Sequence, residues 1–278
     1  MAVVGYDVYY YLYLHEDAQG DPALNPKRFL KFQLNEVIPL TSDTSLFRFQ
    51  MNMPLAMVQQ IPVPCSVIVK DHTCQIGRHY SPISWDYDHF DLIVKKYPDG
   101  AVSQFIHSAV PGDKIEICGA FETWKYQPGD YDHIAMIAGG TGVTPCYQLI
   151  KKILKDPSDN TQISLIYANR TEADILLRSE LEFLTNKYPD QIKVYHTVET
   201  GTTWSWKQGK GYINEKMVQQ MVPSPDSDKR LQILVCGPEG MMRHVSGTKG
   251  TPVDQDEQGP LGGILAKLGY TAEQVYKL

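Results

Sequence analysis

A short stretch near the middle of the chain has the residue types and spacing of a phosphate-binding turn. Residues 134–138 form an apolar run typical of a buried strand, and glycines follow at positions 139, 140 and 142. Pro145 then opens a segment with helical periodicity, where its missing N–H costs nothing. A glycine turn between strand and helix lets the backbone approach a phosphate at the helix N-terminus. A tight turn without a ligand is the alternative, because position 145 lacks the third glycine of the dinucleotide fingerprint.

The N-terminal half holds a second group of residues that are spaced for binding. Arg78 and Tyr80 are two positions apart, so they share one face of a strand and can hold a phosphate and a planar ring. Gly100 precedes Ser103, which we expect to cap a helix whose N–H groups form an anion site. The alternatives are a surface charge at Arg78, a core residue at Tyr80 and simple helix capping by Ser103.

A third stretch is an apolar strand that ends in a cysteine. Cys236 follows the run Leu-Val and precedes Gly237 and Pro238, which break the strand. In a parallel sheet the carboxyl ends of the strands are where ligands bind, so the position of this cysteine suggests a functional role. The alternative is a buried cysteine that serves as a small apolar side chain.

Composition and charge exclude several other classes of function. The net charge of −6 argues against nucleic acid as the main partner. The five cysteines are scattered without a C-x-x-C pair, which indicates reduced thiols rather than a disulfide framework or a zinc site. His72, Cys74, His79 and His89 lack the spacing of a metal motif, so we expect no metal.

Short strands must position the residues of the N-terminal half. Five strand-like runs, separated by turns rich in Ser, Thr, Asp and Pro, lie at residues 29–37, 45–51, 66–70, 91–97 and 114–118. One helix, predicted at residues 103–109, interrupts the series. We therefore expect residues 28–126 to form an antiparallel six-stranded β-barrel.

After residue 132 strands and helices alternate. We predict strands at residues 133–138, 162–168, 192–197 and 232–236. We predict helices at residues 146–154, 179–188, 214–221 and near 261–268. This alternation is typical of an α/β Rossmann-like domain with a parallel sheet, which we place at residues 127–278.

The N-terminal segment stays open to several interpretations. We assign residues 1–27 to a tail and linker. Residues 1–14 are apolar and rich in tyrosine, but a membrane span needs about 20 apolar residues. The segment also lacks the basic start and cleavage site of a signal peptide. It can be the interfacial end of a shortened anchor, an edge strand or a tail without fixed structure.

Four motifs in one order resemble those of the ferredoxin-reductase-like flavoproteins, and within them the NADH–cytochrome b5 reductase family. The motifs are R-x-Y-[ST]-x-x-S at residues 78–84, G-x-[MV]-S at 100–103, G-G-T-G-[IV]-T-P at 139–145 and C-G-P-x-x-M at 236–241. Residues 94–100, 169–178 and 209–213 also resemble family segments, and the tail at 269–277 is similar to the fungal mitochondrial-type branch. The resemblance covers residues 28–278, and four motifs in order are far more specific than any one.

The resemblance implies two sets of cofactor-binding residues. FAD would be held by Arg78, Tyr80, Ser81, Ser84, Lys95, Tyr97, Gly100, Val102 and Ser103. NADH would be held by Gly140, Thr141, Gly142, Thr144, Glu199, Cys236, Gly237, Pro238 and Met241. Among these, Thr141 and Cys236 are the residues that we expect to set the geometry of the reaction. A carboxylate at Glu199 can bind the adenine ribose and would repel a 2′-phosphate, which favours NADH over NADPH.

The activity implied by the resemblance passes a hydride from NADH to FAD and then single electrons to cytochrome b5 or another haem protein. One alternative is the same module with a quinone as acceptor, and another is a non-catalytic nucleotide-binding protein. The second is motivated by the abbreviated N-terminus and by Glu239 and Gly240, which replace a run of prolines in the family pattern. Ser81 and Leu278 also depart from that pattern, which has threonine and an aromatic residue there.

The resemblance also carries expectations about assembly and location. It implies a monomer at the mitochondrial outer membrane and intermembrane space or at the cytosolic surface of the endoplasmic reticulum. Membrane association would use the abbreviated N-terminus, and a chain without an anchor would be cytosolic.

Overall fold

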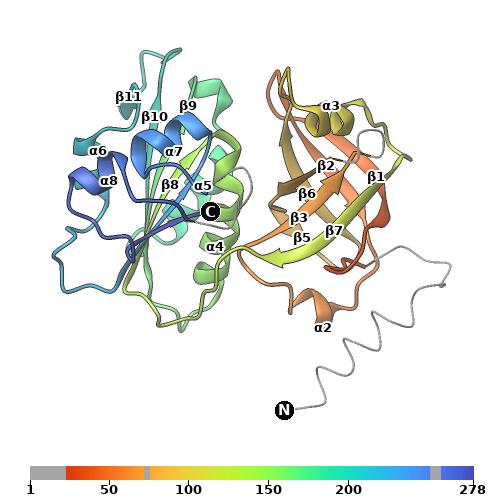
Figure 1. Cartoon of the computed structure of the whole chain (residues 1–278), viewed down its shortest axis with the longest axis horizontal. Helices are drawn as coiled ribbons and strands as arrows, with labels where there is room; N and C mark the ends of the chain where they lie inside the picture. The colour runs from red at the N-terminus through yellow and green to blue at the C-terminus, as the bar shows by residue number, and fades with distance from the viewer. Residues whose placement is uncertain (1–22, 72–75, 251–257) are drawn as a thin grey trace. The chain divides into compact units, whose positions relative to one another are not determined.

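The computed structural model describes residues 23–71, 76–250 and 258–278, and it divides into two compact units between Thr123 and Trp124 (Figure 1). The segment 1–14, most of the predicted linker, His72 and Cys74 lie outside the described residues. The division comes three residues before the predicted one, because Trp124 and Tyr126 contact the second unit. The Trp124 ring lies 6.4 Å from the ring of Tyr276, and the hydroxyl of Tyr126 donates to Asp159.

The first unit is a seven-stranded antiparallel sheet. Its strands are β1 (Leu30–Pro39), β2 (Thr44–Gln50), β3 (Cys65–Lys70), β4 (Gly77–Tyr80), β5 (Ser84–Trp85), β6 (His89–Lys95) and β7 (Lys114–Glu122). They lie in the order β4-β3-β7-β1-β2-β6-β5, and every ladder is antiparallel. The antiparallel architecture predicted from the sequence is confirmed, with one strand more than the predicted six. The additional strand is β5, whose two residues are too few to leave a periodic pattern.

One apolar core holds this sheet together. Phe32, Phe47, Phe49 and Phe90 are fully buried, because alternate residues of an antiparallel strand point to the same side. The Phe90 ring stacks on Phe49 at 5.4 Å and meets the ring of Phe32 edge-on at 5.3 Å. β4 and β5, the first and last strands in this order, both contribute to the same cluster through Tyr80 and Trp85, so the sheet curls around its core. The helix α3 (Ala101–Ser108) contributes to it as well. A shorter helix, α2 (Leu55–Val58), lies between β2 and β3 in the chain.

The second unit is a six-stranded parallel sheet with helices on both faces. Its strands are β8 (His133–Gly139), β9 (Gln162–Asn169), β10 (Ile192–Val198), β11 (Gly209–Lys210), β12 (Leu231–Cys236) and β13 (Val275–Lys277). They lie in the order β11-β10-β9-β8-β12-β13, and every ladder is parallel. The predicted Rossmann-like sheet is therefore confirmed. Only the short edge strands β11 and β13 are additional.

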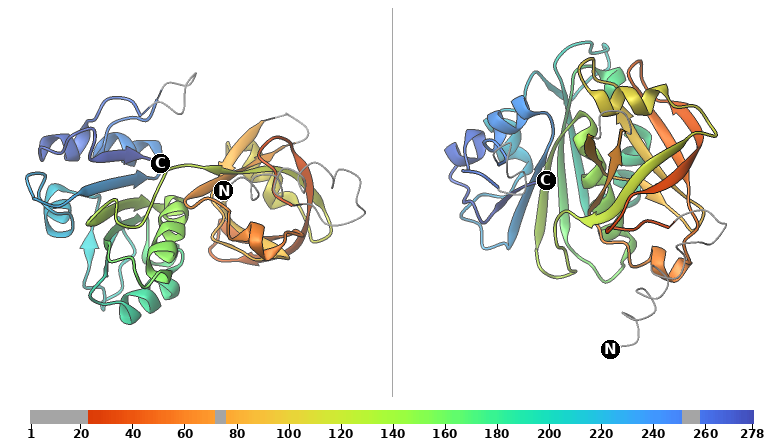
Figure 2. Two further views of the ribbon diagram at one scale, coloured as in Figure 1. Left: turned by 90° about the horizontal axis from the view of Figure 1, so that it is seen from below. Right: turned by 45° about the vertical axis from the view of Figure 1, so that its right-hand side comes forward.

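Five α-helices in the described part of the second unit cover the sheet. They are α4 (Val143–Lys155), α5 (Arg178–Lys187), α6 (Glu215–Met221), α7 (Glu239–Val245) and α8 (Gly263–Lys267). Figures 1 and 2 show α4 on one face of the sheet and α6, α7 and α8 on the other. Apolar residues of these last three helices pack against Ala135, Ile137 and Ile233 in one cluster. The glycine turn lies at the carboxyl end of β8, where the chain leaves the sheet and enters α4.

Candidate active site

The glycine turn joins β8 to α4 through the short 3₁₀ helix η1 (Gly140–Gly142). Gly140 has a φ of +52°, a conformation that side chains disfavour. A Cβ atom on Gly142 would collide with the backbone carbonyl of Cys236, so only glycine allows this close approach. The Thr144 hydroxyl donates to the carbonyl of Thr141 at 3.0 Å and ties the turn to the first turn of α4. Helix α4 starts at Val143, three residues earlier than predicted, since the 3₁₀ turn continues into it.

Strand order brings the C-G-P-x-x-M segment to this turn. β12 pairs in parallel with β8, with Cys236 opposite Ala138. Pro238 is the N-cap of α7, and a Cβ atom on Gly139 would lie 2.6 Å from Met241 Sδ. The turn and the cysteine segment, far apart in sequence, therefore form one surface at the carboxyl edge of the sheet.

The thiol of Cys236 is neutral at physiological pH. Burial raises its pKa from 9.0 to about 11, and the charge of Lys249 opposes this shift only in part. An uncharged, polarisable side chain at this edge suits a position beside a planar ring better than a nucleophilic role.

One residue that supports the turn is not among those predicted from the sequence. Tyr167 of β9 is fully buried, and its hydroxyl donates to the carbonyl of Gly140 at 3.0 Å. Burial raises the pKa of this phenol, so it stays protonated and keeps donating. An aromatic residue inside an apolar strand is predicted to be a core residue. Nothing in the neighbouring sequence indicates that its hydroxyl binds a turn from another part of the chain.

Glu199 lies on the same edge, just after β10. Its backbone N–H donates to the carbonyl of Asn169 at the end of β9, at 3.1 Å, and its side chain is exposed. The loop that follows is held by Glu172, which accepts from the N–H and hydroxyl of Thr203 at 3.2 and 2.9 Å. Arg178 binds the same carboxylate at 2.9 Å. The loop is therefore anchored, while Glu199 remains available to a ligand.

In the first unit the register of β4 places Arg78 and Tyr80 on one face. β3 and β4 pair Val69 with Arg78 and Val67 with Tyr80, so both side chains share the face of these valines. Tyr80 is half-buried, and burial raises the pKa of its hydroxyl to about 12. The Arg78 guanidinium is exposed and donates only to the carbonyl of Gly77 within the described residues. Ser81 follows directly after the strand. This arrangement fits a ring against Tyr80 and an anion at Arg78.

Ser103 does not cap a helix as the sequence suggested. Helix α3 begins at Ala101 with Gly100 as its N-cap, so Ser103 lies inside the first turn. Its hydroxyl donates to the carbonyl of Gly100 at 2.9 Å and accepts from the N–H of Tyr97 at 3.1 Å. The prediction failed because serine in the first helical turn can bond backward as well as cap. Ser103 thus holds the turn that precedes the helix.

This turn fits an anion at the start of α3. Among the described residues, no acceptor pairs with the backbone N–H groups of Ala101, Val102 and Ser103. The Val102 side chain belongs to the core, so only its backbone can reach a ligand. A helix start with open N–H groups suits a phosphate.

Three further predicted FAD residues have different surroundings. The Lys95 ammonium pairs with Asp43 at 2.9 Å, and the Ser84 hydroxyl donates to Asp91 at 2.7 Å. The Tyr97 side chain is 46% exposed. Lys95 and Ser84 thus have protein partners already, whereas Tyr97 presents its ring to solvent. Their roles in FAD binding stay predictions.

Two kinds of feature are absent from the described ranges. There, no group of three or more His, Cys, Asp and Glu side chains is placed to hold a metal ion. The helices of the same ranges include none with the length and apolar character of a membrane span.

Known proteins match both halves of the chain in the order expected from the motifs. Residues 31–126 match the oxidoreductase FAD-binding domain family, and residues 136–247 match the oxidoreductase NAD-binding domain family. NADH-cytochrome b5 reductase-like protein of Arabidopsis thaliana is 42% identical over 271 residues, which cover 94% of this chain and 80% of that protein. NADH-cytochrome b5 reductase 2 of Aspergillus fumigatus is 35% identical over 290 residues, covering 100% and 88%.

A solved structure matches over nearly the whole chain as well. The cytochrome b5 reductase domain of Ulva prolifera nitrate reductase has a TM-score of 0.76 and 33% identity, covering 92% of this chain and all of that domain. Each half of the described structure has a feature that suits its family match, a helix start with open N–H groups in one and a glycine turn in the other. The chain therefore belongs to the NADH–cytochrome b5 reductase family, as an oxidoreductase with an FAD-binding and a NAD-binding domain.

Proposed function

We propose that this chain takes a hydride from NADH onto FAD and delivers single electrons to cytochrome b5. The observation that carries the proposal is the contact between the glycine turn and the segment of Cys236, in a chain that also has an FAD-binding domain. When bound, FAD supplies the chemistry, because it can accept a two-electron hydride and release electrons one at a time.

In the first domain the protein's task is to hold FAD. Arg78 supplies a positive charge to a phosphate, and the open N–H groups at the start of α3 supply neutral donors. Tyr80 offers a ring face beside Arg78 on the same strand face. These groups orient the cofactor and exclude water, and no proton transfer is required of them.

In the second domain the protein's task is to hold NADH. The turn at residues 139–142 admits a phosphate-bearing backbone, and Thr141 and Cys236 limit the position of the nicotinamide. Since the Cys236 thiol is neutral, it adds contact surface without adding a charge. Glu199 favours a free ribose hydroxyl over a 2′-phosphate, so NADH is the preferred donor.

An absorbance spectrum of the purified protein tests the first half of the proposal. We expect flavin bands that bleach when NADH is added without oxygen. A colourless protein that takes up no FAD would refute the proposal. If nucleotide binds but NADH reduces neither flavin nor ferricyanide, the chain is a non-catalytic binding protein.

Stopped-flow mixing of the reduced protein with oxidised cytochrome b5 tests the acceptor. We expect reoxidation of the flavin and reduction of the haem at matching rates, which fall as salt is added if charged surfaces meet. Rapid reoxidation by a quinone together with inertness toward cytochrome b5 would reassign the acceptor while leaving the NADH step intact.

Monomeric state and location are part of the proposal too. Family resemblance supports a monomer at a mitochondrial or endoplasmic-reticulum surface, and the tyrosine-rich residues 1–14 suit a membrane interface. Sedimentation of the full chain with and without vesicles distinguishes these cases. A dimer, or a chain that stays in the supernatant with every vesicle composition, would contradict them.

A further inference from the structure

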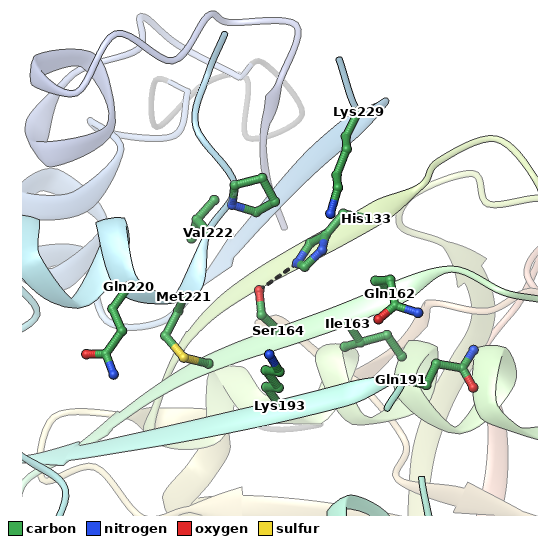
Figure 3. A pocket seen from close by; sticks show the side chains of 11 residues that line it. His133, Gln162, Ile163, Ser164, Gln191, Lys193, Gln220, Met221, Val222 and Lys229 are labelled. Carbon is green, nitrogen blue, oxygen red and sulfur yellow. Dashed lines mark hydrogen bonds between the residues drawn. The ribbon is translucent and has the colours of Figure 1, made fainter. Parts of the chain in front are cut away.

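A cavity of about 260 Å³ lies in the second unit at the amino ends of the strands (Figure 3). Its lining includes the first residues of β8 and β9, the start of β10 and the C-terminal end of α6. The glycine turn lies at the opposite, carboxyl ends of the same strands. The cavity is therefore separate from the nucleotide site, and the activity proposed above makes no use of it.

The floor of the cavity is a fixed polar pair. His133 Nε2 lies 2.9 Å from the hydroxyl of Ser164 on the neighbouring strand. Ser164 is 2% exposed, and the parallel register of β8 and β9 sets its distance from His133. Within the described part of the chain, His133 Nδ1 has no hydrogen-bond partner, so this nitrogen is available to a ligand.

Two lysines approach this pair from different elements. Lys193 belongs to β10 and Lys229 to the loop before β12, and Figure 3 shows both ammonium ends directed toward His133 and Ser164. Burial and the charges of Lys229 and Lys193 lower the pKa of His133 to about 4, which agrees with their closeness.

Neither Lys193 nor Lys229 is held in an ion pair within the described residues. Asp228 directly precedes Lys229, and Asp190 lies three residues before Lys193, yet neither carboxylate forms an ion pair with these lysines. The Asp132 carboxylate interacts electrostatically with Lys229, but its hydrogen bonds and ion pair are with Arg230, at 2.6 Å. In a chain with a net charge of −6, two unpaired lysines around one cavity form a local excess of positive charge.

The size and remaining lining of the cavity limit its ligand. Small-molecule pockets usually reach about 300 to 1,000 Å³, so this one suits a small ion rather than a nucleotide. Gln162 and Gln220 bring amides, and Met221, Val222 and Pro223 form an apolar wall. The Gln191 amide is already bound to the carbonyls of Asp159 and Thr161 at 2.7 and 3.2 Å.

We propose that this cavity binds a small, doubly charged oxyanion of the phosphate or sulfate type. The Lys193 and Lys229 ammonium groups would neutralise the charge, and the imidazole of His133 would donate from Nδ1 to the anion while its Nε2 accepts from the hydroxyl of Ser164. Two cations and a neutral donor favour a dianion over a monoanion such as acetate, because each ammonium pairs with one negative charge.

Titration of the FAD-loaded full chain with sulfate, at constant ionic strength set by chloride, tests this site. Sulfate remains a dianion at neutral and mildly acidic pH, so its own charge does not change. We expect the His133 imidazole signal in NMR spectra to move and saturate, and its pKa to rise, since a bound dianion favours the imidazolium. Phosphate should compete with sulfate, whereas acetate should not. If the chemical shift of the His133 imidazole does not change as sulfate is added, the proposal is overturned.

A matched pair of double variants checks where the anion binds. Lys193→Gln with Lys229→Gln should weaken sulfate binding by about tenfold or more, from the loss of two charge-assisted contacts. Lys216→Gln with Lys267→Gln removes the same charge from exposed positions outside the cavity and should leave the affinity unchanged. Equal weakening in both double variants would show non-specific attraction and reject the site. Flavin content and the unfolding midpoint in chloride confirm that each variant is folded.

Discussion

At the scale of single residues, burial decides which side chains at the carboxyl edge carry charge. Cys236 and Tyr167 both lie against the glycine turn, and burial raises the pKa of each, so both remain protonated. Glu199, at the end of the neighbouring strand, is exposed and bears its charge toward solvent. The edge thus has a neutral portion near Cys236 and an acidic portion near Glu199, which suits the positions proposed above for the nicotinamide and the ribose.

The neutral thiol predicts slow alkylation of Cys236. Near pH 8 its thiolate fraction should be roughly a hundredfold smaller than that of an ordinary cysteine, since its pKa is raised to about 11. Mass spectrometry after treatment with iodoacetamide measures the rate in the folded protein and in urea. The folded rate should keep rising up to high pH. A rate that levels off below about pH 9 would mean that the thiol has its ordinary pKa.

Glu199 predicts the choice of nucleotide. We expect Glu199→Gln to lower the preference for NADH over NADPH by about tenfold, because a 2′-phosphate no longer meets a carboxylate. The ratio of kcat/KM for the two nucleotides measures the change. Glu215→Gln, a neutralisation on α6, serves as control and should leave the ratio as it is. An unchanged ratio in Glu199→Gln would place the ribose elsewhere.

At the scale of elements, the backbone of the β8–α4 turn approaches the end of β12 closely. A single hydrogen atom in place of a side chain at Gly142 allows it. The same edge is bounded by the C-terminal strand β13, which carries a buried lysine. Gly142 lets the turn pack against β12, and Lys277 holds the loop before α8.

Gly142→Ala should destabilise the NAD-binding domain and weaken NADH binding, because the new methyl group collides with the carbonyl of Cys236. We expect a loss of about 2 kcal/mol or more in the free energy of unfolding. Gly240→Ala is the matched control within α7, where a Cβ atom meets no atom within 4 Å. This change should stabilise by about 0.5 to 1 kcal/mol through helix propensity. Urea unfolding compares the two, and equal signs would contradict the packing described here.

Lys277 of β13 holds the loop before α8 by its ammonium group. It is 2% exposed and donates to the carbonyls of Thr248, Gln258, Gly259 and Pro260 at 3.0, 2.6, 3.3 and 2.9 Å. No carboxylate among the described residues pairs with it. The cation therefore satisfies backbone carbonyls on both sides of residues 251–257.

Lys277→Met should release this loop while the sheet persists. We expect a loss of about 2 to 4 kcal/mol in the free energy of unfolding, since several buried carbonyls lose a charged donor. Limited proteolysis should show faster cleavage between residues 247 and 260. Lys267→Met, at an exposed end of α8, should change stability by less than about 0.5 kcal/mol. Identical cleavage patterns in both variants would speak against the role of Lys277.

At the scale of the whole molecule, acid should destabilise the second unit through its buried histidines. His196 is 4% exposed, and burial together with the charge of Arg178 lowers its pKa from 6.5 to about 4. The unfolded chain therefore binds a proton between these two pH values while the folded chain does not, so stability falls as the pH falls. Between pH 7 and 5 this residue should cost about 2 kcal/mol.

Replacement of His196 tests this dependence. His196→Gln removes the titrating group, so the difference in unfolding free energy between pH 7 and 5 should shrink by about 2 kcal/mol. Urea unfolding at both pH values measures it, whatever the variant's stability at pH 7. A pH dependence that is the same in both proteins would show that the pKa of His196 is the same in the folded and the unfolded chain.

Much of this fold was readable from local patterns. The four longest strands of the parallel sheet and four of the five helices described there were predicted within a few residues, because the periodicity of apolar residues and glycine turns are local signals. Helix α7, with only seven residues, was not among the predicted helices. The prediction that Ser103 caps α3 was wrong, because a serine near a helix start can either cap the helix or donate to a preceding carbonyl. Which of the two it does depends on where the helix begins. Tyr167 and Lys277 were missed because a single residue inside a strand run does not reveal its hydrogen-bond partners.

By itself, the sequence determined the two domains, the family motifs and the residue types available to each cofactor. Tertiary structure alone decided that Cys236 lies against Gly142, because strand order puts β12 beside β8. It also decided that Lys193 and Lys229 face His133, since parallel pairing gathers the amino ends of distant strands at one edge. The pattern of apolar residues in a segment indicates which side of a helix or strand is buried. Which strands lie side by side depends on the topology of the whole sheet, which cannot be inferred from one short segment.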